Sequence, residues 1–508
     1  MSKEHKQRFI LNLKLKTQPY QEDILDKRFE IGRKMYNALL GRALKRYNEM
    51  VKTTIWRNNQ VVLSHLYKIT PPDKRDDKAF CKLCEPCYDI RNAMLKEFRL
   101  NEYSLHEDVQ PMQRIFKKNI DAFTAQKIAS RVWKAISDKL FGDGGHVHFK
   151  KYGTLSSLEG KANRTGMRYN IENNLFLWNG LEIPVMLNLN NQYEIDALRS
   201  KICYCRIKRI FVKDRYKYIL QLVLEGVPPI KVIKATGEIK DSIGVGTTGI
   251  DMGTQTIAYV NDYDVKLLEL APRVQNIEDA KRRVQRYMDR SKRASNPQNF
   301  NKDGTVKKGR LTWDYSKRYI KARKKIKDLY RRQANIRRLD HNIMANEIIK
   351  NCNTVYVEEM NFKALQKKSK NTEKNEHGKF KRKKRFGKSL AKKAPAMFLT
   401  MLENKLKAKG GLYYEVNTRE VKASQYNHLD RQYSKKKLSQ RWNYFDYNNT
   451  AIKVQRDMYS AYLIKNVNED LNSINTKQCT IDFDKFLKLH NKEVQRLQGQ
   501  ENLSSMGI

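Results

Sequence analysis

The chain has 508 residues, which is enough for several domains and a sizeable hydrophobic core. It carries 102 Lys and Arg against 55 Asp and Glu, a formal net charge of +47, so we expect a polyanionic partner, with nucleic acid as the first candidate and a merely basic protein as the alternative. No apolar run is long enough to span a bilayer, and residues 1–9 are charged rather than signal-like, which argues against a membrane protein.

The N-terminal part of the chain alternates between two kinds of pattern. Residues 8–16 place apolar and polar side chains in strict alternation, which is typical of a half-buried strand. Helical spacing follows, and strand patterns return after about residue 165. The order is therefore strand, helices, strands. The predicted helices are 23–47, 88–98 and 110–141, and the predicted strands are 174–178, 181–187 and a hairpin of 202–212 with 217–225.

Three of the seven cysteines lie close together, as Cys81, Cys84 and Cys87. Cys81 and Cys84 have zinc-knuckle spacing, and Cys87 could be a third ligand. His65 and His106 are candidates for a fourth ligand. A Zn²⁺ site is one interpretation of this cluster, and a cysteine-containing loop is the other.

An acidic residue interrupts an apolar stretch at residues 248–260. Asp251 stands where the first of two predicted strands, 248–252 and 256–261, should end, and Gly249 and Gly253 flank it so that another group can approach the backbone closely. A carboxylate in an apolar strand needs a positive partner, for which a divalent metal is the obvious candidate. The alternative is a turn Asp that closes a hairpin. With a third strand at 265–270, short connections predict an antiparallel meander.

Two further acidic positions favour the metal interpretation. Residues 353–362 form a β-branched and aromatic run that ends in Glu358 and Glu359, and Asp457 precedes an apolar helix pattern. Two strand-end acids and one at a helix start are the oxygen ligands that a site with two Mg²⁺ or Mn²⁺ ions needs for phosphodiester hydrolysis. Asp430 and Asp446 are alternatives for the third acid, but neither precedes an apolar helix.

Cationic residues are concentrated in predicted helices at 277–293 and 315–350 and in a polar stretch at 363–393. One stripe of the second helix is apolar, and its other faces are basic. These basic faces are interpreted as contacts with a nucleic-acid backbone, and the alternative is that they are simply solvated. The residues selected as nucleic-acid contacts are Arg323, Lys324, Arg331, Arg332, Arg337, Lys381, Arg382, Lys383, Lys384, Arg385 and Arg441.

The ordered set Gly-Ile-Asp-Met-Gly (249–253), Val-Glu-Glu-Met-Asn (357–361) and Arg-Asp-x-x-Ser-Ala (456–461) resembles the split RuvC nuclease of transposon-encoded TnpB proteins and compact type V CRISPR effectors. The resemblance implies Asp251, Glu358 and Asp457 as catalytic Mg²⁺ ligands. The sequence departs from the pattern of this family at 417–449, where the usual four-cysteine zinc ribbon is missing. There His428, Gln440 and Arg441 are candidates for substrate contacts, and packing or turn roles are the alternative.

The resemblance also implies an α+β multidomain fold. A β-barrel wedge domain (1–20 and 150–242) would be interrupted by a helical recognition lobe (21–149). An RNase H-like (RuvC) α/β nuclease domain with inserted basic helices (243–470) would follow, and then a tail (471–508).

The function implied by the resemblance is cleavage of double-stranded DNA directed by a guide RNA, in a prokaryotic, nucleoid-associated cytoplasmic protein. A guide-independent RuvC-like nuclease linked to transposition and a binding-only repressor derived from such a nuclease are the alternatives. All three acids are present, which argues against the repressor.

Overall fold

The computed structural model divides into two compact units, Met1–Ile230 and Lys231–Ile508. The structure describes residues 7–71, 74–75, 77–142, 144–233, 235–367, 371, 376, 386–437, 439–500 and 506–508. The boundary falls at the start of the polar segment 230–242, twelve residues before the end predicted for the wedge domain. Among the described residues, no helix combines the length and the apolar character needed to cross a membrane.

The first unit is built on a seven-stranded antiparallel sheet with the order β2-β6-β7-β1-β5-β4-β3. In β1 every second residue is buried, as the alternation in the sequence predicts. The hydrogen-bonded order ends at β2 and β3, yet β3 also contacts β6, so the sheet curls on itself, and the expected β-barrel stays a prediction. The strands are β1 (Arg8–Leu15), β2 (Ser157–Glu159), β3 (Arg168–Asn170), β4 (Leu175–Trp178), β5 (Leu181–Met186), β6 (Ile202–Val212) and β7 (Arg215–Glu225).

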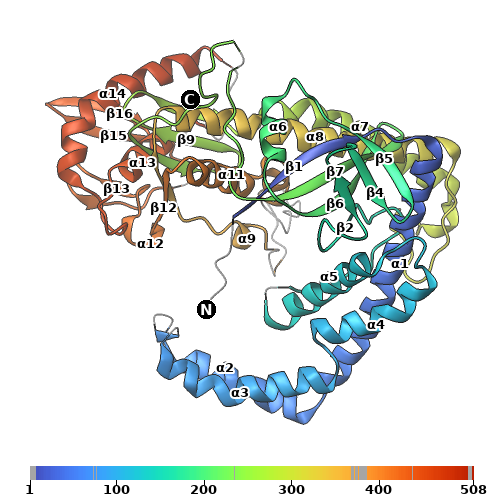
Figure 1. Ribbon diagram of the computed structural model, residues 1–508. Helices are drawn as coiled ribbons and strands as arrows, with labels where there is room; N and C mark the ends of the chain where they lie inside the picture. Colours follow the sequence, from blue (N-terminus) through green and yellow to red (C-terminus); the bar gives the residue numbers. More distant parts are fainter. Residues whose placement is uncertain are drawn as a thin grey trace. The chain divides into compact units, whose positions relative to one another are not determined.

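Helices between β1 and β2 share one hydrophobic core with this sheet. Helices α1, α4 and α5 contact one another and run side by side in Figure 1. The predicted helix 110–141 is two helices, because Asp121 caps a new helix by accepting a hydrogen bond from Thr124 N at 2.9 Å. The helices are α1 (Pro19–Met50), α2 (Thr54–Ile69), α3 (Lys78–Glu97), α4 (Glu102–Ile115) and α5 (Ala122–Phe141), with α6 (Gln192–Leu198) following β5.

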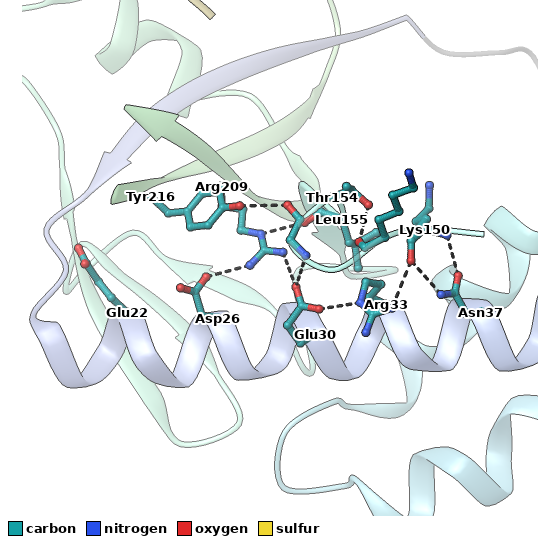
Figure 2. Close-up of polar contacts among 12 residues, drawn as sticks. Glu22, Asp26, Glu30, Arg33, Asn37, Lys150, Thr154, Leu155, Arg209 and Tyr216 are labelled. Atoms are coloured by element: carbon teal, nitrogen blue, oxygen red, sulfur yellow. Dashed lines mark hydrogen bonds and ion pairs between the residues drawn. The ribbon is translucent and has the colours of Figure 1, made fainter. Parts of the chain in front are cut away.

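A buried arginine joins α1 to the sheet in this unit. Only 2% of the Arg209 side chain is exposed, and its Nη atoms pair with Asp26 at 2.9 Å and Glu30 at 2.8 Å (Figure 2). Its Nε donates to the carbonyl oxygen of Leu155 at 2.8 Å, and the ring of Tyr216 lies 4.7 Å from the guanidinium. Because every charge has an opposite partner, this network is satisfied within the fold.

The second unit contains a five-stranded mixed sheet with the order β10-β9-β8-β11-β12. Strand β9 is antiparallel to both β8 and β10, which confirms the predicted meander, and β8, β11 and β12 are parallel. Helices α8 and α11 cover one face, and α13 and α14 pack on the other. The strands are β8 (Thr247–Met252), β9 (Thr256–Val260), β10 (Val265–Glu269), β11 (Thr354–Glu358) and β12 (Leu412–Val416).

The predicted basic helices are α7 (Val274–Ser295) and α8 (Lys317–Lys350), joined by a loop with a short 3₁₀ turn, η2 (Pro297–Asn299). After β11 come α9 (Phe362–Leu365), α10 (Gly387–Lys393) and α11 (Pro395–Ala408). In place of a zinc ribbon the chain forms α12 (Thr418–Val421) and two hairpins, β13 (Tyr426–Asn427) with β14 (Gln432–Tyr433) and β15 (Trp442–Tyr447) with β16 (Thr450–Gln455). The second hairpin leads into α13 (Arg456–Lys465).

The segment predicted as a C-terminal tail is instead part of the second unit's core. Helix α14 (Thr476–Gln498) buries Cys479, Phe483 and Phe486 against α13. The buried Glu493 accepts a hydrogen bond from Leu267 N of β10 at 2.9 Å. The polar composition of residues 471–508 gave little sign of this core position, because only one face of α14 is apolar.

Candidate functional site

Two of the predicted catalytic acids lie on the same face of the second sheet. Ile250 of β8 pairs in register with Val357 of β11, so Asp251 and Glu358 occupy the next position of each parallel strand. Ile250 and Val357 point into the core beneath α8 and α11. Because side chains alternate along a strand, the two acids face the opposite side, where α13 lies. Parallel strands thus bring acids 107 positions apart in sequence to one edge of one face.

Helix α13 supplies the third acid by crossing that face closely. A Cβ atom on Gly249 would lie 2.2 Å from both the carbonyl oxygen of Ala461 and the backbone nitrogen of Lys465, so only glycine admits the helix here. This confirms that the glycine serves a close backbone approach. Asp457 lies in the first turn of α13, one helical turn before Ala461.

The acids influence one another electrostatically. Burial raises the pKa of Asp251 well above its ordinary value, and the neighbouring carboxylates of Glu358 and Asp457 raise it further. Arg456 and the hydroxyl of Ser460, both on α13, act in the opposite direction. Burial also raises the pKa of Glu358. The three acids predicted from separate motifs are therefore neighbours, and the negative charges of Glu358 and Asp457 both act on Asp251.

Arginines neutralise Asp457 in this arrangement. Arg456 donates from Nη2 to Asp457 Oδ1 at 3.1 Å, and Arg441 Nη1 lies 3.6 Å from Asp457 Oδ2. Arg456 also donates to the carbonyl oxygen of Gln440 at 3.0 Å. Arg456 was not among the site residues predicted from the sequence. Its position immediately before Asp457 in the sequence could have indicated a role at the site, because a cation there is within reach of the Asp457 carboxylate.

The donor set suits a hard divalent cation. Asp251, Glu358 and Asp457 offer only carboxylate oxygens, which Mg²⁺ and Mn²⁺ prefer, and the raised pKa of Asp251 reflects, beside its burial, neighbouring negative charge that a cation would offset. As the side chains stand, however, no group of three or more His, Cys, Asp and Glu in the described part of the chain is close enough to hold a metal ion. The alternatives for the third acid, Asp430 and Asp446, are exposed on the hairpin segment.

The structure separates the predicted nucleic-acid contacts into groups. Arg323, Lys324 and Arg332 are exposed on α8. Arg331 is paired within α8 with Asp328 at 2.7 Å, and Arg337 donates to the carbonyl oxygen of Ala391 at 2.7 Å, so these two have partners inside the protein, and their contact with nucleic acid stays a prediction. Lys381, Arg382, Lys383, Lys384 and Arg385 lie outside the described residues.

The cysteine cluster lies on a helix rather than in a loop. Cys81, Cys84 and Cys87 are all within α3, at intervals of three residues. Cys84 and Cys87 are buried, while Cys81 is exposed. The Zn²⁺ site stays a prediction, and the helix rules out the loop interpretation.

His428 has a packing role. Its Nδ1 lies 2.6 Å from the hydroxyl of Tyr459 on α13, and the ring is 4.6 Å from that of Phe483. Burial lowers the pKa of His428 to about 4, so the side chain is neutral at physiological pH. Gln440 and Arg441, by contrast, lie beside the acidic site through their contacts with Arg456 and Asp457.

No protein-family model matches the sequence, and no curated protein matches it. Among solved structures, the chain is similar to a Cas12f1–sgRNA–target DNA complex at 12% identity and a TM-score of 0.38, covering 92% of this chain and 99% of that one. It is also similar to a CRISPR–Cas12f ternary complex at 12% identity and a TM-score of 0.23, covering 88% and 82%. At these values neither likeness assigns a residue or an activity to the chain.

Proposed function

We propose that this protein is an RNA-guided DNA endonuclease with a RuvC-like centre at Asp251, Glu358 and Asp457. The observation that carries the proposal is the convergence of three separate motifs on one edge of the second sheet, through the register of β8 with β11 and the close crossing of α13. The antiparallel start of that sheet supports an RNase H-like domain of the kind implied by the sequence motifs.

The proposed roles follow from the positions of the side chains. Asp251 and Glu358 would hold Mg²⁺ or Mn²⁺ from the sheet, and Asp457 would hold it from α13. When bound, divalent cations supply the Lewis acidity for phosphodiester hydrolysis. Arg456 and Arg441 offset the charge of Asp457. No nucleophilic side chain is required, because water is the attacking group.

The proposed partners are a guide RNA and target double-stranded DNA. The net charge of +47 supports a polyanionic partner. Sequence choice would come from pairing between guide and target rather than from side chains that read bases.

Replacement of Asp251 tests the proposal. We expect Asp251→Ala to abolish DNA cleavage in Mg²⁺ while leaving DNA binding within about threefold of the parent, because the carboxylate acts on the reaction more than on affinity. Gel assays of cleavage and fluorescence anisotropy of binding measure the two. A variant that cuts as fast as the parent refutes the site. RNA that copurifies and is required for cutting supports the guided mode, and cutting without RNA supports the guide-independent alternative.

A binding-only protein is the second candidate, and the pairing of Asp457 with two arginines favours it. A parent protein that binds guide and target but never cuts them in Mg²⁺ or Mn²⁺ would support this candidate over the nuclease.

A further inference from the structure

A concave site lies between α7 and α8, away from the three acids. The helices run antiparallel and are tied together on either side of it. On one side Lys281 donates to Gln333 at 2.8 Å and Gln285 donates to the hydroxyl of Tyr330 at 3.1 Å. On the other side the hydroxyls of Ser291 and Ser316 lie 3.2 Å apart. The site between these ties therefore has fixed walls.

Its lining combines an apolar floor with an aromatic wall and a cationic rim. The volume is about 410 Å³, within the range of small-molecule sites. Val284 and the buried Ala322 form the floor, and Tyr287, 38% exposed, forms a wall. The rim carries four cations, Arg283, Arg318, Lys321 and Lys325.

The rim cations lack internal partners. Some basic residues of the same helices are paired, as Lys281 is with Glu278 and Arg331 with Asp328. Within the part of the chain that the structure describes, none of the four rim cations takes part in an ion pair or a hydrogen bond. Like charges at helical spacing, such as Lys321 and Lys325, destabilise a helix. An anionic ligand would remove that repulsion.

The aromatic surface continues at the start of α8. The rings of Tyr315 and Tyr319 stack with centroids 4.6 Å apart, on the same turns as Arg318. Tyr315 is 39% exposed, so an outer ring face is available to another flat group. Cations interleaved with exposed rings are the combination that binds single strands, because bases stack and phosphates pair.

We propose that the α7–α8 groove binds one unpaired nucleotide of a single-stranded nucleic acid, with the base on Tyr287 and the adjoining phosphates on the four rim cations. The apolar floor would contribute nothing to a duplex, whose bases are stacked inside and whose phosphates alone reach the protein. The proposal rests on the proposed function for its nucleic-acid partner, but it does not depend on cleavage.

Equilibrium binding tests it with the Asp251→Ala full chain, freed of nucleic acid and kept in EDTA. The probes are a fluorescent 12-nucleotide DNA strand, the same strand with abasic sites throughout, the matching duplex, and adenosine monophosphate. We expect Tyr287→Ala to lower the affinity for the base-bearing strand roughly tenfold, because the ring supplies base stacking. Its affinities for the abasic strand and for the duplex should not change. Tyr287→Phe should bind like the parent.

Charge is tested separately. Lys321→Ala combined with Lys325→Ala should weaken both the normal and the abasic strand and reduce the salt dependence, whereas Lys477→Ala, which removes an exposed charge from α14, should change neither. Thermal melts verify that every variant is folded. Equal losses for the normal and the abasic strand in Tyr287→Ala, or no loss for either, overturn the proposal. Adenosine monophosphate binding as tightly as the strand would identify a free nucleotide as the ligand and overturn the assignment to a strand. Because no cutting is measured, failure of the nuclease proposal would leave these results intact.

Discussion

Partly buried carboxylates occur in both units, but their surroundings are opposite. In the first unit, hydrogen bonds from Arg209, Arg33 and the backbone of Gly153 outweigh the burial of Glu30 and lower its pKa. In the second, burial and neighbouring acids raise the pKa of Asp251. A paired carboxylate stabilises the fold that pairs it, whereas acids placed together oppose folding and are expected where they serve a function. The contrast separates a structural network from a candidate catalytic centre.

The largest expected effect distinguishes two adjacent acids. Glu358→Gln should lower the cleavage rate by about a thousandfold, because Glu358 lies beside Asp251 on the neighbouring strand, on the same face of the sheet. Glu359 is exposed one residue further on, and Glu359→Gln should stay within about threefold of the parent. Single-turnover cleavage measures both. Equal losses would show that the strand register does not define the centre.

Removing the buried cation of the first unit should be costly for stability. Arg209→Met removes the buried cation that Asp26 and Glu30 share, leaving Glu30 with Arg33 alone, and should lower the free energy of unfolding by about 3–5 kcal/mol. The exposed pair of Arg199 with Asp196 provides the control, and Arg199→Met should cost about 0–1 kcal/mol. Urea unfolding followed by circular dichroism compares them. A loss as small as the control's would remove the structural half of the contrast.

The close crossing of α13 predicts a smaller loss. Gly249→Ala places a methyl group 2.2 Å from backbone atoms of α13, so the helix must shift, at a cost of about 1–3 kcal/mol and with reduced cleavage. Gly145→Ala is the control, because nothing lies within 4 Å of a Cβ atom there. Thermal unfolding and cleavage assays are the measurements. Full activity in Gly249→Ala would mean that Asp457 does not depend on this contact.

The smallest expected effect is that of neutralising one carboxylate on the free energy of unfolding, and it should have opposite signs in the two units. Because the pKa of Asp251 is raised in the folded protein, its contribution to stability is lost as pH rises through the folded-state value, so Asp251→Asn should stabilise the metal-free protein at pH 8. Because the pKa of Glu30 is lowered in the folded protein, ionised Glu30 stabilises the fold above its unfolded-state pKa. That stabilisation is lost as pH falls through the folded-state pKa, so Glu30→Gln should destabilise the protein at neutral pH. Thermal melts in EDTA at several pH values test both, and the same sign for both variants would contradict the comparison.

Local patterns predicted the elements of the candidate site well. The predicted strands 248–252 and 256–261, the β-branched run that ends in Glu358 and the helix after Asp457 are confirmed, because alternation, helical spacing and turn residues are properties of neighbouring positions. The side-chain partners were less predictable. Arg331 and Arg337 looked like surface cations, but contacts with Asp328 and with α10 engage them.

The sequence by itself determined which residue types could form an acidic centre, the strands that end in two of the acids, and the basic character of the protein. Only the tertiary structure decided that β8 and β11 are adjacent and parallel, that α13 crosses Gly249, and that Arg456 and Arg441 meet Asp457. It also placed α14 in the core and Cys84 and Cys87 on the buried face of a helix. The physical reason is that periodicity records which face of an element is buried, whereas the identity of the partner depends on contacts between residues far apart in the chain.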